Sequence, residues 1–284
     1  MHADQTIDVD GFSNNLDAIC RTDLAAIFVC CGTGEFHALS LDEYRTLVMT
    51  ARDVIAGRKP LLAGVGMGPA QALEFAATAQ QLDAGGVLAL PPYLITPDPA
   101  GLEDYYRQLA ESLEISVILY HRANAVLTAA TLERLSSVEK VIAVKDGIGD
   151  IETLRRHIVT FGDRYGWMSG MPTVEMSFEA FYACGVRSYS SAIANFAPAA
   201  ALASHEAVVS GNNDRCARML REFIIPLCGI RDRRPGYAVS YVKAAMNLLG
   251  LAAGPVRPPL VELTPHEQQE LAEILRANGL PARG

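Results

Sequence analysis

Apolar segments of strand type alternate with longer amphipathic segments along this chain, at a spacing of about 25 residues. Seven such apolar segments lie between Asp23 and Ser191, and Gly, Pro and Asp stand at most of the junctions. This repetition is typical of βαβ units that build a parallel sheet. Doubly wound sheets rarely keep such a regular alternation over so many units, whereas a barrel needs the alternation around its whole ring. The pattern therefore predicts an α/β fold, a (β/α)8 TIM barrel.

The expected elements can be given as residue ranges. Strands are expected at residues 23–31, 60–65, 86–90, 115–120, 141–145, 165–169 and 186–191, with helices between them at about 40–57, 69–85, 102–113, 128–135, 150–161 and 174–184. Another helix starts at Pro198, and the pattern then becomes purely helical, with segments at 214–231, 237–249 and 264–278. We expect residues 1–209 to form the barrel and residues 210–284 to form a C-terminal helical extension packed on it.

The eighth strand of the barrel is hard to find in the sequence. Only residues 5–9 are left for it, and the stretch Thr6-Ile7-Asp8-Val9 is short and half polar. The helix that should follow, at about residues 14–20, is short as well. We expect the first strand to be short or missing. A poorly formed strand, a chain that starts downstream of its natural beginning, and a barrel closed with a partner chain's help all remain open.

The composition argues against several classes of function. The formal net charge of −8 disfavours nucleic acid and anionic membranes as partners. No stretch reaches the roughly 18 apolar residues of a membrane helix, and the N-terminus has no signal-peptide pattern. We therefore expect a cytoplasmic protein with reduced cysteines. The cysteines and histidines show no metal-ligand spacing, and Pro69 breaks the glycine pattern of residues 64–68, so neither a metal nor an organic cofactor is expected.

Lys145 is the best candidate for covalent chemistry. The chain has four lysines, and only Lys145 directly follows an apolar strand segment. Lys59 and Lys140 precede strands, at the opposite end of a parallel barrel, and Lys243 falls in a C-terminal helix. Active sites of such barrels lie at the carboxyl ends of the strands, where burial lowers the pKa of a lysine and frees its amine to attack a carbonyl. The alternative is a surface lysine after a strand, which is the commoner case for a lysine taken at random.

Tyr120 ends the strand before that of Lys145. Neighbouring strands lie about 4.8 Å apart, so both side chains can point into the same barrel mouth. A phenol beside an amine can shuttle protons while an imine forms and reacts. Taken alone, Tyr120 is equally well explained as a packing tyrosine.

Other polar residues follow the expected strands. The stretch Gly32-Thr33-Gly34 can present backbone amides and a hydroxyl to an anion, although an ordinary glycine-rich turn would look the same. Four more side chains could hold hydroxyls or a carboxylate of an extended substrate, or could be parts of solvated loops: Arg122, Asn124, Ser191 and Asn195.

A set of motifs resembles one known family. The chain carries C-G-T-G-E-F at 31–36, P-P-Y-L at 91–94, V-K-D-G-I-G-D at 144–150, G-M-P-T at 170–173, Y-S-S-A at 189–192, R-P-G-Y-A-V at 234–239 and G-P-V-R-P-P-L at 254–260. Together they resemble the class I, Schiff-base aldolase and dehydratase superfamily of dihydrodipicolinate synthase and N-acetylneuraminate lyase. The closest resemblance is to its 5-dehydro-4-deoxyglucarate dehydratase branch, from about residue 9 to the C-terminus.

Departures from the family pattern narrow the expected activity. Gly32 stands where dihydrodipicolinate synthases carry the first threonine of G-T-T-G-E, and Leu94 stands where they carry a second tyrosine. Those synthases use a tyrosine–threonine–tyrosine proton relay, which both changes remove. Both changes fit the glucarate branch. Less usual for that branch are His121, in the place of an asparagine, and Ala123, in the place of an acid.

The resemblance implies a reaction and a set of roles. The reaction is the conversion of 5-dehydro-4-deoxy-D-glucarate to 2,5-dioxopentanoate, carbon dioxide and water through a Schiff base on Lys145. By this resemblance, Tyr120 is expected to transfer protons, and Thr33 and the amides of its loop are expected to bind a carboxylate. A homotetramer acting on a small keto sugar acid is implied as well. A related Schiff-base aldolase acting on a pyruvate-containing sugar acid, and a non-catalytic relative with a degraded N-terminus, are the alternatives.

Overall fold

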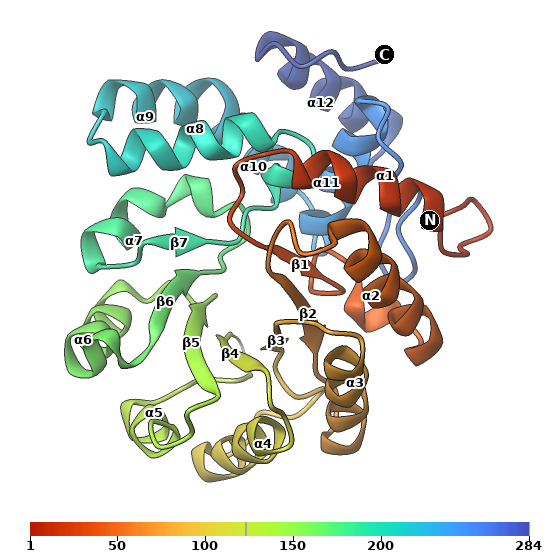
Figure 1. Ribbon diagram of the computed structural model, residues 1–284. Coiled ribbons are helices and arrows are strands. Elements are labelled where there is room, and N and C mark those ends of the chain that lie inside the picture. Colours follow the sequence, from red (N-terminus) through yellow and green to blue (C-terminus); the bar gives the residue numbers. More distant parts are fainter. Residues whose placement is uncertain (123, 284) are drawn as a thin grey trace.

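A parallel sheet of seven strands forms the centre of the molecule (Figure 1). The computed structural model describes residues 1–122 and 124–283. Within this part of the chain the sheet order is β1 to β7, so that strands adjacent in sequence are adjacent in the sheet. The bounds are β1 Ile27–Val29, β2 Leu61–Val65, β3 Gly86–Ala89, β4 Ser116–His121, β5 Val141–Asp146, β6 Gly166–Ser169 and β7 Ser188–Tyr189. All seven predicted strands are confirmed.

Helices cover the outside of the sheet and continue beyond it. The helices are α1 Val9–Cys20, α2 Leu41–Ile55, α3 Pro69–Gln81, α4 Pro99–Glu111, α5 Ala129–Leu135, α6 Ile151–Phe161, α7 Phe178–Cys184, α8 Pro198–Val209, α9 Asn213–Met219, α10 Ile225–Arg231, α11 Tyr237–Leu248 and α12 Pro265–Ala277. Figure 1 shows α2 to α7 arranged around the strands. The predicted α/β architecture of barrel type, followed by C-terminal helices, is therefore confirmed.

The N-terminal segment confirms that the first strand is missing, but its helix is longer than expected. Residues 5–9 form no strand, and α1 is a 12-residue helix that begins at Val9, well before the expected position 14. Asp8 is the reason, because its side chain accepts a hydrogen bond from the Gly11 amide and caps the helix. The helix buries Leu16 and Cys20 in the main core. The residues that could have supplied an eighth strand thus cap and begin helix α1 instead.

Two other helices depart from the predicted bounds. Helix α4 begins at Pro99 instead of 102, because the Asp98 side chain accepts from the Ala100 amide and Pro99 occupies the first turn. The helix predicted at 214–231 is interrupted by a π-helical turn at Leu220–Ile224. Pro226, which has no amide hydrogen to donate to the preceding turn, lies just beyond this irregular segment.

Side chains alternate between the two faces of the sheet. One face packs against the helices in the main core through residues such as Ala63, Val87, Leu119 and Val144. The inner face holds a separate apolar cluster of Leu62, Leu88, Ile118, Tyr120 and Ala143. Since side chains repeat every second residue along a strand, Lys145 lies on the same inner face as Ala143.

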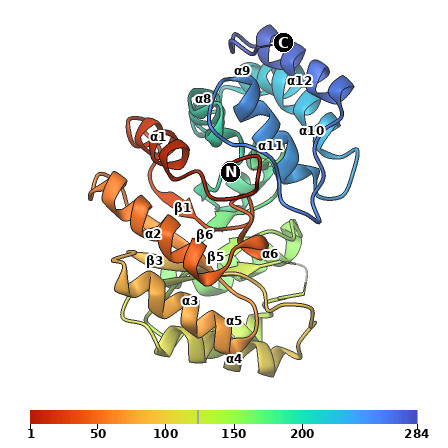
Figure 2. The same cartoon turned by 90° about the vertical axis from the view of Figure 1, so that its right-hand side faces the viewer.

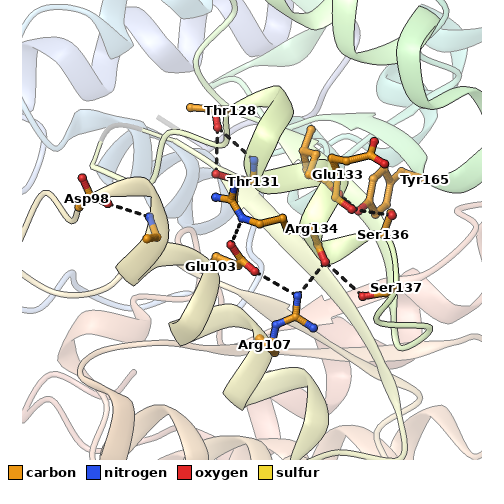
Figure 3. A network of polar contacts seen from close by, with 12 residues as sticks. Asp98, Glu103, Arg107, Thr128, Thr131, Glu133, Arg134, Ser136, Ser137 and Tyr165 are labelled. Carbon is orange, nitrogen blue, oxygen red and sulfur yellow. Dashed lines mark hydrogen bonds and ion pairs between the residues drawn. The ribbon is translucent and has the colours of Figure 1, made fainter.

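Polar contacts join the outer helices to one another (Figure 3). Glu103 of α4 accepts hydrogen bonds from Arg107, at 3.1 Å, and from Arg134 of α5. Arg107 also donates to the Arg134 carbonyl oxygen at 2.7 Å. These contacts fix α5 against α4, at a distance from the inner face of the sheet.

The C-terminal helices share a second apolar core with the end of the barrel. This core joins Phe196 and Ala201 to residues of α10, α11 and α12, such as Leu227, Tyr241 and Leu271. Figure 2 shows α9 to α12 gathered at one end of the molecule. We propose the turn at residues 210–212, between α8 and α9, as the boundary between barrel and extension.

A buried ion pair attaches the extension to the barrel. Lys243 of α11 donates to Glu35 Oε1 at 2.7 Å, and the Arg257 amide donates to Glu35 Oε2 at 2.8 Å. Glu35 lies in the turn after β1 and is almost fully buried. A carboxylate in such a place is stable only when it is paired and hydrogen-bonded.

The substitution Lys243→Met should lower the free energy of unfolding by about 3–5 kcal/mol, because it leaves the Glu35 carboxylate buried without its cation. The double substitution Lys243→Met with Glu35→Gln should recover most of that loss. Lys140→Met is the matched control, since Lys140 pairs with Glu114 at the surface and such pairs contribute at most about 1 kcal/mol. Urea denaturation measures all three, and equal losses for Lys243→Met and Lys140→Met would contradict the prediction.

Candidate active site

The β4–β5 pairing places Lys145 beside Tyr120. The two residues are register partners, and Lys145 is in turn paired with Met168 of β6. The amine nitrogen lies 4.6 Å from the centre of the Tyr120 ring. Both residues lie near the carboxyl ends of their strands, on the inner face of the sheet. The structure therefore brings together the two residues that the sequence singled out for imine chemistry.

Two glycines make room for this pair. A Cβ atom on Gly170 would lie 2.3 Å from Lys145 Cε, and a Cβ on Gly147 would lie 2.7 Å from Tyr120 Cε2. Gly170 directly follows β6, and Gly147 directly follows β5. Any larger residue at either position would displace one of the two side chains.

Burial lowers the pKa of Lys145 to about 8. Only 8% of the residue is exposed, and loss of hydration disfavours the charged amine. The positive charge of Arg122 adds to this shift, and the nearby Cys31 opposes it. Among the residues that the structure describes, the Lys145 amine has no carboxylate partner, and its uncharged fraction near neutral pH is much larger than that of an ordinary lysine.

Tyr120 is held by two hydrogen bonds. Its hydroxyl donates to the Gly170 carbonyl oxygen at 2.8 Å and accepts from Arg122 Nη1 at 2.9 Å. Burial raises the pKa of Tyr120, while the nearby Arg122 lowers it. The phenol therefore keeps its proton near neutral pH, and its ring lies beside the Lys145 amine. Arg122, predicted as a carboxylate ligand, lies on the surface and supports this phenol.

The turn after β1 presents Thr33 at the surface. Gly32, Thr33 and Gly34 are all exposed, and the turn is closed by a hydrogen bond of 3.1 Å from the Glu35 amide to the Gly32 carbonyl oxygen. Glu35, with a positive φ of 54°, anchors the turn to the C-terminal extension. The turn is thus rigidly attached at its end while its hydroxyl and amides remain accessible.

The amides of two predicted substrate ligands are engaged within loops. Asn124 donates to the carbonyl oxygens of Pro92, at 2.6 Å, and Ile95, at 2.9 Å, and so holds the P-P-Y-L loop. Asn195 donates to the Ala192 carbonyl oxygen at 3.0 Å. Their side-chain oxygens remain the groups with which they could meet a substrate.

Ser191 is paired with a residue that the sequence analysis did not consider. Its hydroxyl donates to Glu175 Oε1 and accepts from the Ala194 amide at 3.0 Å. Glu175 is buried, and burial raises its pKa. The only signal in the sequence was its place two residues after the G-M-P-T motif, and nothing there distinguishes a buried glutamate from a surface one.

His121 forms a second buried polar contact close to Lys145. Its Nδ1 lies 3.3 Å from Asp146 Oδ2, and Asp146 Oδ1 accepts from the Gly149 amide at 2.8 Å. Asp146 directly follows Lys145, so these contacts fix the strand end that carries the amine. Ala123, which the sequence analysis also marked as unusual, lies outside the described residues.

The described residues contain neither a metal-binding cluster nor a membrane-spanning helix. No cluster of three or more His, Cys, Asp or Glu side chains there is arranged to hold a metal ion. In the same residues, no helix is both long and apolar enough to cross a membrane.

Comparison with known sequences identifies the family. The model of the dihydrodipicolinate synthetase family matches residues 1–278. A protein of Bradyrhizobium sp. (strain ORS 278), named probable 5-dehydro-4-deoxyglucarate dehydratase, is 41% identical over 97% of this chain and 88% of its own length. A protein of Bacillus subtilis (strain 168) with the same name is 36% identical over 95% of this chain and 88% of its own length. The chain belongs to the dihydrodipicolinate synthetase family, and the predicted resemblance is confirmed.

Solved structures agree with this assignment. Dihydrodipicolinate synthase from Oceanobacillus iheyensis superposes with a TM-score of 0.91 at 26% identity, covering 98% of this chain and 93% of that one. The enzyme of the same name from Bacillus clausii gives a TM-score of 0.90 at 26% identity, covering 98% and 94%. The fold is therefore that of the family over nearly the whole chain.

The substitution Gly170→Ala should slow imine formation at Lys145 by about 100-fold, because the added methyl group displaces the lysine side chain from its position. The measurement is the rate of borohydride trapping with pyruvate, read as added mass on the peptide that contains Lys145. Gly101→Ala is the control, since a Cβ at Gly101 meets nothing within 4 Å. Equal trapping rates in the two variants would contradict the prediction.

The pH dependence of trapping should report the lowered pKa of Lys145. Only the free amine attacks a carbonyl, and its fraction rises about tenfold per pH unit below the pKa and levels off above it. The trapping rate should therefore level off above a pH of about 8 instead of near the ordinary lysine value of 10.5. A rate that continues to rise to pH 10 would mean that burial does not control this amine.

Proposed function

We propose that this chain is a decarboxylating dehydratase that converts 5-dehydro-4-deoxy-D-glucarate to 2,5-dioxopentanoate, carbon dioxide and water, in D-glucarate catabolism. The observation that carries the proposal is the buried amine of Lys145, with its lowered pKa, beside the Tyr120 ring at the carboxyl ends of the strands. Relatives at 36–41% identity carry the name of this activity. The departures at Gly32 and Leu94 favour it over dihydrodipicolinate synthesis.

The chemistry follows from what an imine can do. Lys145 attacks the substrate ketone, and loss of water gives a protonated imine. The imine acidifies the adjacent CH2 group, and proton loss gives an enamine. The enamine expels the β-hydroxyl group and leaves a conjugated imine. This extended electron sink accepts the electron pair released when the distal carboxylate leaves as carbon dioxide, and hydrolysis then returns the free amine. No metal or organic cofactor is needed for any step.

Each site residue has a proposed role. Tyr120 carries protons to and from the imine nitrogen or the departing hydroxyl, which its hydrogen bonds to Gly170 and Arg122 support. Thr33 and the amides of Gly32 and Gly34 bind the keto-acid carboxylate, for which their exposed turn is suited. Weaker support exists for four further substrate contacts: Arg122, Asn124, Ser191 and Asn195.

The proposal includes a homo-oligomer, a tetramer by resemblance, in the cytoplasm. Three large side chains in and directly after the P-P-Y-L motif, Tyr93, Leu94 and Ile95, are mostly exposed, with Leu94 exposed by 85%. A second copy of the chain is a reasonable partner for such a surface. Light scattering on the purified protein measures the number of copies.

Lys145→Ala should lower turnover of 5-dehydro-4-deoxyglucarate by about 10⁴-fold or more, because removal of a covalent nucleophile abolishes the intermediate. Lys140→Ala should keep wild-type turnover, since Lys140 binds Glu114 at the other end of the strands. Borohydride with substrate should add mass only to the peptide that contains Lys145. An adduct on another lysine would refute the assignment.

The same assay separates the alternatives. A related Schiff-base aldolase would still be trapped on Lys145 but would release a pyruvate fragment and no carbon dioxide. A non-catalytic relative would be folded by circular dichroism and would bind pyruvate without turnover of any candidate.

A further inference from the structure

Glu175 is a buried carboxyl group that the proposed reaction does not yet use. It lies in a short helix, Val174–Met176, which follows β6 and the Gly170–Thr173 segment. Only 4% of the residue is exposed. Ser191 binds one carboxyl oxygen, and the other, Oε2, has no hydrogen-bond partner among the described residues. Such an arrangement is costly, and it calls for an explanation beyond packing.

The groups around Glu175 are polar but mostly neutral. Tyr189 of β7, Cys228 of α10 and Tyr241 of α11 lie close enough that a negative charge on Glu175 would raise their pKa values, and the Tyr241 hydroxyl lies 3.1 Å from the Thr173 hydroxyl. Arg231 of α10, whose charge acts on Cys228 and Tyr241, is hydrogen-bonded to Asp232 and to the Pro172 carbonyl oxygen. Within the described residues no cation pairs with Glu175.

This environment favours the neutral acid. Burial removes the hydration that a carboxylate needs, and for that reason the pKa of Glu175 is raised, although the Ser191 hydrogen bond partly opposes the shift. A neutral carboxyl group can donate a proton, which a carboxylate cannot. Glu175 therefore has the properties of a general acid, and its hydrogen-bond partner is the Ser191 hydroxyl group.

Ser191 connects this acid to the edge of the sheet that carries Lys145. The neighbouring Ser190 amide donates to the Ser169 carbonyl oxygen at 3.1 Å. The next residue, Gly170, packs against Lys145 and accepts the hydrogen bond of Tyr120. Ser191 itself is only partly buried, whereas Glu175 behind it is buried. The hydroxyl of Ser191 is thus the accessible end of a two-residue chain of proton carriers.

We propose that neutral Glu175 supplies, through the Ser191 hydroxyl, the proton that the leaving hydroxyl group takes during dehydration; the inference rests on the proposed function. In this step the enamine electron pair forms the new carbon–carbon double bond, and the carbon–oxygen bond breaks with its electrons on oxygen. The Ser191 proton turns from Glu175 to that oxygen and gives water, and neutral Glu175 donates its own proton to Ser191 Oγ across the same contact. Glu175 is left as a carboxylate and regains a proton from solvent before the next turnover.

A pH dependence follows from this assignment. Dehydration needs the protonated acid, so turnover should fall as pH rises through the raised pKa of Glu175. The rate of imine formation at Lys145 rises with pH up to the pKa of its amine, about 8. The two groups therefore produce opposite limbs of a bell-shaped profile.

The test uses Glu175→Gln, which keeps the size of the side chain and its hydrogen bond to Ser191 but holds no transferable acid proton. We expect turnover of 5-dehydro-4-deoxyglucarate to fall by about 100-fold or more, since general acids contribute about 10²–10⁴-fold. The limb of the pH profile that declines at high pH should disappear. Imine trapping with pyruvate should keep its wild-type rate. With substrate, borohydride should trap mainly the adduct that has not yet lost water.

Two further variants separate catalysis from folding. Ser191→Ala should show the same loss, and combining it with Glu175→Gln should add little, because both act on one proton path. Thr173→Val removes a neighbouring hydroxyl from the same buried cluster and should turn over substrate at close to the wild-type rate.

Several outcomes would overturn the proposal. Unchanged turnover or an unchanged pH profile in Glu175→Gln would overturn this inference and leave the proposed function standing. A loss of pyruvate trapping in that variant would also overturn the inference, since the defect would precede dehydration. Absence of turnover in the wild type would overturn the proposed function, and this inference with it.

Discussion

The parallel pairing of β4 with β5 is the constraint on which the site depends. Register places Tyr120 opposite Lys145, and the twofold repeat of side chains along a strand directs both to the inner face. A slip of one residue would turn the amine toward the helices and lose the pair. The glycines at 147 and 170 matter for the same reason, because they leave the inner face open where these two side chains meet.

The two buried lysines illustrate how partners decide chemistry. Lys145 and Lys243 are each 8% exposed. Lys243 is compensated by the Glu35 carboxylate, and the pair serves to attach the extension to the turn after β1. Lys145 has a tyrosine ring beside it and no carboxylate among the described residues, so burial acts on it uncompensated and its pKa falls to about 8. Equal burial thus gives one lysine that is ion-paired and one whose pKa is lowered.

Much of the fold was predictable because its signals are local. Apolar runs of strand length, a capping box at Ser40 and Glu43, and the position of each lysine relative to a strand need no knowledge of distant residues. The prediction of a short or missing first strand was confirmed, but the first helix begins earlier than predicted because the Asp8 side chain caps it. Asn124 proved to support the P-P-Y-L loop, since its partners at Pro92 and Ile95 lie some thirty positions earlier in the chain.

By itself the sequence determined the parallel architecture, the face of the sheet on which Lys145 and Tyr120 lie, and the resemblance that names a reaction. These depend on residue type, spacing and order along the chain. Only the tertiary structure decided which ionisable groups are buried and with what partners: Glu35 with Lys243, Asp146 with His121, and Glu175 with Ser191. The reason is physical. The charge state of a group is set by the dielectric and the partners around it, and in this protein those partners come from segments far apart in the chain.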